Sequence, residues 1–292
     1  VSERLVLNAG DYGLAVQERA ELIMLSDIAG YVGADTCGCL LAIRQDQQEE
    51  ISLMIDIGTN GEMVLGNRER MVTCSTAAGP AFEGAKIECG MRGAAGAVDH
   101  VKYEDGKWNY TTVGNKPAVG LCGSGLIDLV AGLLDAGMLD ENGVLRSGQE
   151  KQGVFILVPP ERGGNERGVY LTQKDLGEVQ LAKAAIAAGI QMLMERLGIT
   201  EDDICSVYIA GAFGNYMDPV SAGKIGLLPA TLVKKVKPVG NAAGEGAKIA
   251  LVNEKEMLEM DELVRKIEFV ELAASADFQD HFIDELGFET GE

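Results

Sequence analysis

Residues 51–62 have the sequence ISLMIDIGTNGE, an apolar strand that runs into an acid and a glycine-containing turn. Asp56 stands at the end of this strand, where a carboxylate can hold a hydrated cation. The glycines of the turn, together with Thr59 and Asn60, let backbone N–H groups and short polar side chains approach an anion. The stretch therefore predicts a β-hairpin that handles phosphate.

A second short apolar strand, residues 206–210, runs into a stretch of small residues from Gly211 to Asn215. Small residues at a strand end allow a flat ring or a ribose to lie against the backbone. If both strands belong to one sheet, their two ends predict a nucleotide cleft.

The order of the elements predicts the fold class. Three short strands joined by glycine-containing turns indicate an antiparallel meander, at residues 52–56, 62–66 and 70–74. Further along we expect helices at 80–88, 123–136, 173–197, 219–224 and 241–253, and strands at 154–158, 207–210 and near 236. This order is typical of a ribonuclease H-like α/β unit, which has a mixed sheet with flanking helices.

We expect three parts along the chain. Residues 1–48 form a helical segment, with its helical stretches between 18 and 42, that belongs to or bridges from a preceding lobe. Residues 49–270 form the ribonuclease H-like lobe, with an inserted hairpin near 93–113, and residues 271–292 form an acidic C-terminal helix or tail. The first residue is valine, which suggests a piece of a longer protein.

The chain is acidic. It has 25 Lys and Arg residues against 45 Asp and Glu residues, and the resulting net charge of −20 argues against nucleic acid as a partner. Residues 251–292 hold 13 of the acids and 3 of the bases, which is about half of the net charge. Helical apolar spacing in this tail indicates a solvated helix face, and an acidic docking surface is the alternative.

Nothing in the sequence indicates a membrane segment or a metal cluster. No apolar run of about 18 residues and no signal peptide is visible, so we expect a cytoplasmic protein without membrane contact. None of the six cysteines forms a C-x-x-C pair, and both histidines are remote from Cys37 and Cys39. We therefore expect reduced structural thiols.

Five motifs follow one another along the chain: IAGYVGAD at 28–35, DIGTNGE at 56–62, CSTAAGPAFEG at 74–84, CGSGL at 122–126 and AGAFGN at 210–215. In this order they resemble the ASKHA superfamily of acetate and sugar kinases, heat-shock chaperones and actin. Within it, the chain looks like the C-terminal ATPase region of the reductive activators of corrinoid proteins. The resemblance spans roughly residues 20–250.

The resemblance implies a machine of three parts: an N-terminal ferredoxin-like domain with a [2Fe–2S] cluster, a connecting region and this ATPase. Such proteins use ATP to return an inactive Co(II) corrinoid protein of a methyltransferase system to Co(I). The plant-type cysteine pattern is absent here, so the cluster is expected only in the missing N-terminal region. ATP and Mg²⁺ are the implied cofactors, a corrinoid protein is the implied partner, and a homodimer is compatible with this scheme.

The resemblance also implies roles for individual residues. Asp56 would hold a water on Mg²⁺ and would form the catalytic group together with Glu62 and Glu83, which would orient the attacking water. The expected phosphate contacts are Gly58, Thr59, Asn60, Gly61, Gly79, Gly123, Ser124 and Gly125. Gly211 and Gly214 would line the adenosine, and Asn215 and Gly244 are further expected nucleotide-binding residues.

The hairpin at 56–62 matches the second phosphate loop of the superfamily, so the chain supplies the second half of the cleft. We therefore expect incomplete nucleotide coordination by this chain in isolation. The glycine-rich stretch 240–246 resembles the late connecting helix of the superfamily, with Asn241 as its N-cap.

Two other functions stay open on the sequence alone. A small-molecule kinase would share the cleft, but it would need an acceptor pocket with a catalytic base, which no motif marks. A docking module without activity of its own would bind a corrinoid protein through a surface near Asp35 or through the acidic tail.

Overall fold

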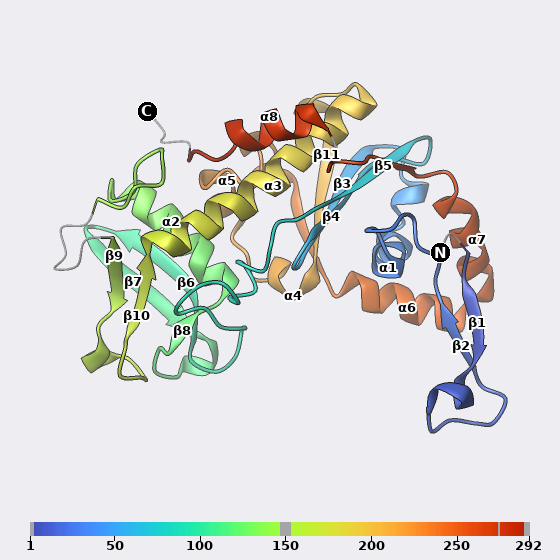
Figure 1. The fold of residues 1–292 in the computed structure, drawn as a ribbon, viewed down its shortest axis with the longest axis horizontal. Coiled ribbons are helices and arrows are strands. Elements are labelled where there is room, and N and C mark those ends of the chain that lie inside the picture. Colours follow the sequence, from blue (N-terminus) through green and yellow to red (C-terminus); the bar gives the residue numbers. More distant parts are fainter. Residues whose placement is uncertain (1–2, 147–152, 274, 289–292) are drawn as a thin grey trace.

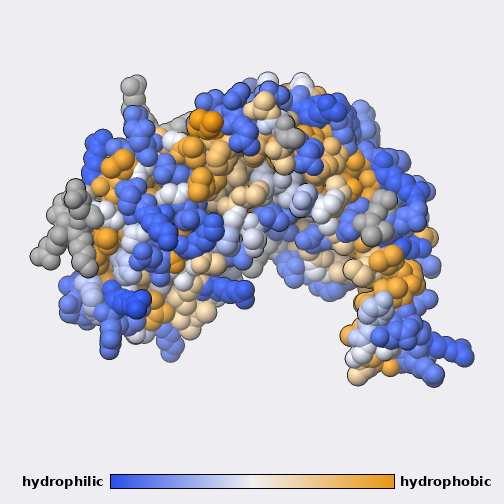
Figure 2. Space-filling view, viewed as in Figure 1, coloured by the Kyte–Doolittle hydropathy of each residue, from blue (hydrophilic) through white to orange (hydrophobic). Residues whose placement is uncertain are grey.

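The computed structural model describes residues 3–146, 153–273 and 275–288 (Figure 1). A central sheet lies between a smaller lobe at one end and a projecting two-stranded arm at the other. Figure 2 shows that the surface between these two ends is concave. The last residues of the expected C-terminal tail, 289–292, lie outside the described residues.

The central sheet is mixed, as the sequence predicts. Its strands are β3 (Ile51–Ile57), β4 (Gly61–Gly66), β5 (Met71–Thr76), β11 (Ile204–Ala210), β12 (Val236–Gly240) and β13 (Glu268–Phe269). Their order is β12-β11-β3-β4-β5-β13. The antiparallel meander of β3, β4 and β5 is confirmed, while β11 pairs with β3, β12 with β11 and β13 with β5 in parallel.

The side chains of β3 contribute alternately to two apolar cores, because successive side chains of a strand point to opposite faces of the sheet. Leu53 and Ile55 belong to the larger core, which α3 (Gln173–Leu197) covers. Met54 belongs to the second core, together with residues of α1 (Ala34–Ile43) and α6 (Ala242–Val252). Both faces of β3 are therefore covered, which explains why its central residues Leu53, Met54 and Ile55 are all apolar.

The smaller lobe is inserted after β5. Its sheet consists of β6 (Ala97–Glu104), β7 (Lys107–Thr112) and β8 (Gly120–Leu121), and α2 (Gly123–Asp135) packs on β6. The hairpin expected near 93–113 is confirmed as β6 and β7. A further hairpin of β9 (Val154–Val158) and β10 (Val169–Thr172) leads into α3, which runs along both lobes (Figure 1).

The N-terminal part differs from its prediction. Instead of a helical segment throughout residues 18–42, the chain forms an antiparallel hairpin of β1 (Leu5–Asn8) and β2 (Glu21–Met24), and only α1 is helical. Residues 21–24 pair with β1, and this partner overrides the weak helical spacing of such a short run. The hairpin forms the projecting arm, and its exposed apolar side chains are visible in Figure 2.

The helix expected at 80–88 is also absent, because this segment forms a series of turns. Gly84 adopts a positive φ of 79°, which ends a right-handed helix. A Cβ on Gly90 would lie 2.1 Å from the Gly84 carbonyl oxygen, so the two glycines bring separate parts of the segment into backbone contact. The helix propensities of residues 80–88 alone could not predict this backbone contact.

The remaining helices are α4 (Gly211–Gly214), α5 (Pro219–Lys224), α7 (Glu254–Val264) and α8 (Ala276–Asp284), with 3₁₀ turns at Ala9–Tyr12, Gln45–Gln47, Val113–Asn115, Pro160–Arg162, Glu201–Asp203 and Ala230–Lys235. Of these helices, α5 has the predicted bounds, α7 and α8 agree with the helical apolar spacing of the tail, and α4 is not among the predictions. No helix among the described residues has both the length and the apolar character needed to cross a membrane. All six cysteines are free thiols, as expected.

The acidic C-terminal region is part of the main core up to residue 288. Helix α8 packs on α3, and Phe288 is buried in the larger core. The Gln180 side chain donates to the Leu286 carbonyl oxygen at 2.9 Å, and the Phe288 amide donates to the Glu141 carbonyl oxygen at 2.8 Å. The described part of the tail is therefore anchored, with its acids on the outer face.

Helices α1 and α6 cross at two glycines. A Cβ on Gly246 would lie 1.9 Å from the Gly38 carbonyl oxygen, and a Cβ on Gly38 would lie 2.8 Å from the Ala243 carbonyl oxygen. The absence of side chains at this crossing lets the two helices pack backbone to backbone below the sheet.

We predict that Gly246→Ala destabilises the fold by about 1–3 kcal/mol, because the added methyl group overpacks the crossing. The matched control is Gly177→Ala on α3, where a Cβ meets nothing within 4 Å, so the change removes only the helix penalty of glycine. Urea unfolding measures both variants. A Gly246→Ala variant as stable as the Gly177→Ala control would contradict the close crossing.

Candidate functional site

The two glycine-rich strand ends predicted from the sequence lie side by side. In the parallel pairing of β11 with β3, Ala210 is opposite Asp56, and in the antiparallel pairing of β3 with β4, Glu62 is opposite Asp56. Gly211 follows directly, with a positive φ of 89°, and a Cβ there would lie 3.0 Å from the Asp56 carboxylate. The sheet thus brings Asp56, Glu62 and Gly211 to one edge.

Asp56 is held by a neighbour that no sequence motif marked. The Cys39 thiol on α1 donates to Asp56 Oδ2 at 3.7 Å. Burial, and then the charge of Asp56, raise the pKa of the Cys39 thiol, so the thiol keeps the proton that it donates. Cys39 therefore fixes one carboxylate oxygen of Asp56.

The carboxylates at this edge repel one another, and no Lys or Arg of the described residues forms an ion pair with Asp56 or Glu62. Burial, and then the nearby charge of Asp35, raise the pKa of the Asp56 carboxyl. Burial also raises the pKa of Glu62, with Asp35 and Asp56 adding to the effect and the Ser75 hydroxyl opposing it. A cation bound at this edge would relieve the cost of ionising these groups.

The turn between β3 and β4 is open to solvent. Thr59 and Asn60 are exposed, and the Gly58 amide donates to the Asn60 carbonyl oxygen at 2.9 Å, which closes the turn. The Thr59 hydroxyl donates to Glu83 Oε1 at 2.9 Å. The structure therefore places Glu83, which is 24 residues away in sequence, directly over the predicted phosphate loop.

The positively charged side chain of Lys86 lies on the same segment as Glu83. Lys86 forms an ion pair with Glu178 at 3.0 Å, and a Cβ on Gly79 would lie 3.7 Å from the Lys86 ammonium nitrogen. Gly79 has a positive φ of 75°, as required by the turn that positions its neighbours. Lys86 is half-exposed, so it is available to an anion that reaches Gly79.

The Gly123-Ser124-Gly125 turn is placed in the smaller lobe, at the start of α2. The Ser124 hydroxyl donates to the Asp99 carbonyl oxygen at 2.8 Å, and a Cβ on Gly125 would lie 2.2 Å from the Val98 carbonyl oxygen. These contacts account for the small residues through packing of α2 on β6. The role of this turn in phosphate binding stays a prediction.

Of the remaining expected nucleotide contacts, Gly211 and Gly214 belong to α4 and Asn215 follows it, whereas Gly244 lies on α6. A Cβ on Gly214 would lie 2.4 Å from the Ile209 side chain, so Gly214 lets α4 fold back on the end of β11. Asn215 approaches Gly240, whose Cβ would lie 3.0 Å from the Asn215 amide nitrogen. Gly244 donates its amide to Asn241 Oδ1 at 2.9 Å, which confirms Asn241 as the N-cap of α6.

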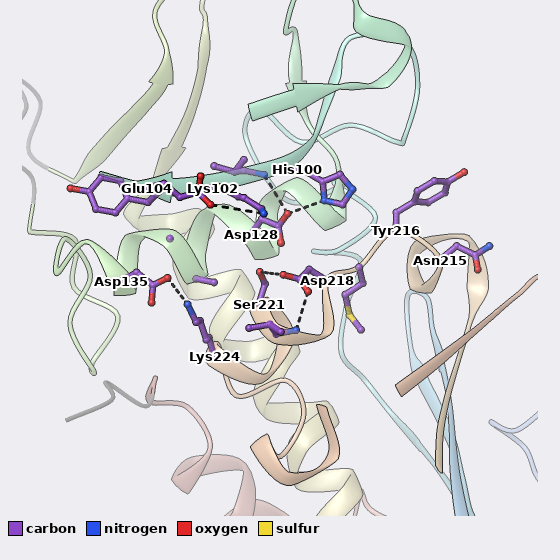
Figure 3. Close-up of a pocket in the computed structure, with 16 residues that line it drawn as sticks. His100, Lys102, Glu104, Asp128, Asp135, Asn215, Tyr216, Asp218, Ser221 and Lys224 are labelled. Carbon is purple, nitrogen blue, oxygen red and sulfur yellow. Dashed lines mark hydrogen bonds and ion pairs between the residues drawn. The ribbon is translucent and has the colours of Figure 1, made fainter. Parts of the chain in front are cut away.

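A cavity of about 660 Å³ lies next to Asn215, between the smaller lobe and α5 (Figure 3). It is lined by His100 and Asp128 of the smaller lobe and by residues that follow α4, among them Tyr216. His100 Nδ1 lies 3.1 Å from Asp128 Oδ2, and burial raises the pKa of the Asp128 carboxyl. A volume of this size is typical of small-molecule sites.

Sequence reasoning missed several residues of this region. The sequence marks Asp35 only as a docking surface and Cys39 only as a structural thiol, and it assigns no role to Lys86, His100 and Asp128. Only Asp35 lies within a quoted motif, the stretch 28–35. Because the others come from segments that are far apart along the chain, only the fold brings them to the site.

The donor set at Asp56 suits a magnesium ion that keeps water. Among the residues that the structure describes, no three His, Cys, Asp or Glu side chains together could hold a metal ion. Mg²⁺ is commonly bound by one or two carboxylates, with waters and phosphate oxygens as its other ligands. Asp56 and Glu62 beside an open glycine turn fit that requirement.

Comparisons with known proteins agree on one family. Residues 50–292 match the model described as the C-terminal domain of RACo, the ASKHA domain. A structure of a reductive activator for corrinoid, iron-sulfur protein matches with a TM-score of 0.90 and 38% identity, over 97% of this chain and 47% of that one. This match confirms the mixed α/β fold class.

Two curated proteins are also similar. The corrinoid activation enzyme RamQ of Eubacterium limosum is 36% identical over 296 residues, which cover 96% of this chain and 50% of that protein. The Co(II) methylated amine-specific corrinoid protein reductase of Methanosarcina barkeri is 29% identical over 303 residues, with coverages of 96% and 54%. The chain therefore spans about half the length of the curated relatives it matches.

The excess negative charge at Asp56 leads to a prediction for Glu62→Gln. Glutamine keeps the acceptor for the Ser75 hydroxyl but removes the charge. Because the pKa of Glu62 is raised in the fold, its ionisation lowers stability once the pH exceeds the unfolded-state pKa of about 4.3. The variant is expected to unfold at a higher urea concentration than the wild type at pH 7, with no difference below about pH 4.

The control for this measurement is Glu69→Gln, a change of the same kind at an exposed residue of the β4–β5 turn. Its urea midpoint is expected to match the wild type at both pH values. A Glu62→Gln variant that is no more stable than the wild type at pH 7 would show that the site carries no excess of negative charge.

Proposed function

The chain belongs to the family of the C-terminal ASKHA domain of RACo, and on this basis we propose that it is the ATP-binding part of an ATP-dependent reductive activator. The activator would return an inactive Co(II) corrinoid protein to Co(I). The names of the similar proteins, a corrinoid activation enzyme and a Co(II) corrinoid protein reductase, support this proposal. The observation that carries it is the placement of Asp56 between the phosphate turn and Gly211.

In this proposal Asp56 holds a water ligand of the magnesium ion, with Cys39 fixing its second oxygen. Thr59 and Asn60, which are exposed, would donate to phosphate oxygens at the turn together with Gly61. Lys86 adds a positive charge near Gly79. When bound, Mg-ATP would supply a phosphoanhydride bond that water cleaves to ADP and phosphate, and the chain would contribute orientation and charge.

Glu62 and Glu83 are the proposed groups that orient the attacking water. Each accepts one hydrogen bond through Oε1, from Ser75 and from Thr59 respectively. In the described part of the chain, Oε2 of either residue has no hydrogen-bond partner, so it remains available to a water. A water held in this way can be aligned with the terminal phosphate.

ATP would affect the electron transfer through closure of two lobes around the nucleotide. Closure would favour a state of the bound corrinoid protein in which Co(II) has lost an axial ligand, and that loss makes reduction easier. A [2Fe–2S] cluster, expected outside this chain, would supply the one electron that converts Co(II) to Co(I). ATP shifts this equilibrium only if it binds the two states differently.

The wider setting is part of the same proposal. The partner is a corrinoid protein of a methyltransferase system, the location is cytoplasmic, and the activator works alone or as a homodimer. The other phosphate-binding lobe, with the first phosphate loop, would correspond to the part of the longer relatives that this chain does not span.

We predict that Asp56→Asn in the whole protein lowers both ATP hydrolysis and ATP-dependent formation of Co(I) by at least tenfold, since the amide is a poor partner for hydrated Mg²⁺. Phosphate release measures the first activity and the absorbance of the corrinoid measures the second. Asp202→Asn, at an exposed position outside the site, is the matched control. Co(I) formation that is equally fast with and without ATP in the wild type would refute the proposed function.

A further inference from the structure

One wall of the cavity beside Asn215 is formed by His100 and Asp128, which are not among the proposed phosphate contacts. His100 on β6 is about half-exposed, with 46% of its side chain accessible, whereas its partner Asp128 on α2 is 4% accessible. Asp128 Oδ2 also accepts the Val101 amide at 3.3 Å. A buried carboxylate with two neighbours thus holds the imidazole at the cavity wall (Figure 3).

This arrangement decides which hydrogen bonds the imidazole can make. Because Asp128 presents a carboxylate oxygen to Nδ1, that nitrogen carries the proton in the neutral ring, and Nε2 is an acceptor. His100 therefore offers one acceptor of fixed orientation to a molecule in the cavity. The matching ligand group is a hydrogen-bond donor.

The cavity is close enough to the phosphate turn to hold the other end of one nucleotide. Gly211 abuts Asp56, and Asn215 lines the cavity. The single helical turn between them advances the backbone by about 6 Å. A triphosphate and a ribose are longer than this, so one extended ligand can reach both places.

The cavity also offers a ring for stacking. Tyr216 lines it and is 64% exposed. An exposed aromatic ring beside polar groups suits a flat, polar ring, because bases stack on aromatic side chains. A nucleobase with an amino group meets both requirements.

We propose that His100, held in place by Asp128, accepts a hydrogen bond from the exocyclic amino group of the nucleobase of the bound nucleotide, with Tyr216 against the ring. This inference rests on the proposed function, because it concerns the base of the same nucleotide. It makes His100 a determinant of base specificity and Asp128 a positioning residue.

The test compares Mg²⁺ complexes of ATP, ITP, 2′-deoxy-ATP and inorganic tripolyphosphate by titration calorimetry on the whole protein. ITP lacks the amino group, and tripolyphosphate lacks the nucleoside. The variant is His100→Phe, which keeps a flat ring and removes the acceptor. The control is His281→Phe, which changes the other histidine of the chain, one that pairs with Glu195 away from the cavity.

The wild type is expected to bind ATP about tenfold more tightly than ITP, the effect of one hydrogen bond to a base. In His100→Phe this preference disappears, while tripolyphosphate binding is unchanged, and His281→Phe behaves as the wild type. Asp128→Asn, if folded, is expected to reduce the same preference, because Asn cannot hold the imidazole in one tautomer with the same strength.

Three results would overturn the inference and leave the proposed function intact. The first is equal binding of ATP and ITP by the wild type, and the second is a preference for ATP over ITP that His100→Phe retains. The third is a His100→Phe variant that loses the discrimination between ATP and 2′-deoxy-ATP but keeps that between ATP and ITP. The last result would assign His100 to the ribose. Failure of the wild type to bind ATP and tripolyphosphate alike would remove the proposed function and this inference together.

Discussion

The parallel pairing of β11 with β3 is the constraint on which the site depends. These two strands are separated by about half of the chain, yet their register sets Ala210 opposite Asp56 and so brings Gly211 against the carboxylate. The antiparallel partner β4 adds Glu62 from the other side. Both faces of β3 are covered by helices, so its central residues 53–55 are apolar and buried, and the charged side chain of Asp56 appears towards the end of the strand.

The same packing leaves the site with an excess of negative charge. Asp35, Asp56 and Glu62 are brought close enough that burial and mutual repulsion raise the pKa values of Asp56 and Glu62. Such an arrangement costs stability in the free protein and favours a bound cation. The glycine contacts have a different role: Gly38 and Gly246 fix the helices below the sheet, and Gly211 leaves space beside Asp56.

Much of the fold could be predicted from local signals. The meander, α2, α3 and α5 follow apolar periodicity and caps, such as Thr172 with Asp175 at the start of α3. The arm and the turns at 80–88 could not, since β2 depends on its pairing with β1 and Gly84 on its contact with Gly90. The residues of the site also fall into a part that local sequence predicts and a part that only the fold brings together. Asp56 and its turn are contiguous in sequence, whereas His100 and Asp128 come together only through the packing of α2 on β6.

The most direct test of this account asks whether Asp56 acts on the nucleotide through the metal. ATP would be titrated into the wild-type whole protein and into Asp56→Asn, each with Mg²⁺ and with a chelator. The account predicts that Mg²⁺ strengthens ATP binding by the wild type at least tenfold, and that most of this gain is lost in the variant. An equal gain from Mg²⁺ in both proteins would contradict the assignment of the metal to the end of β3.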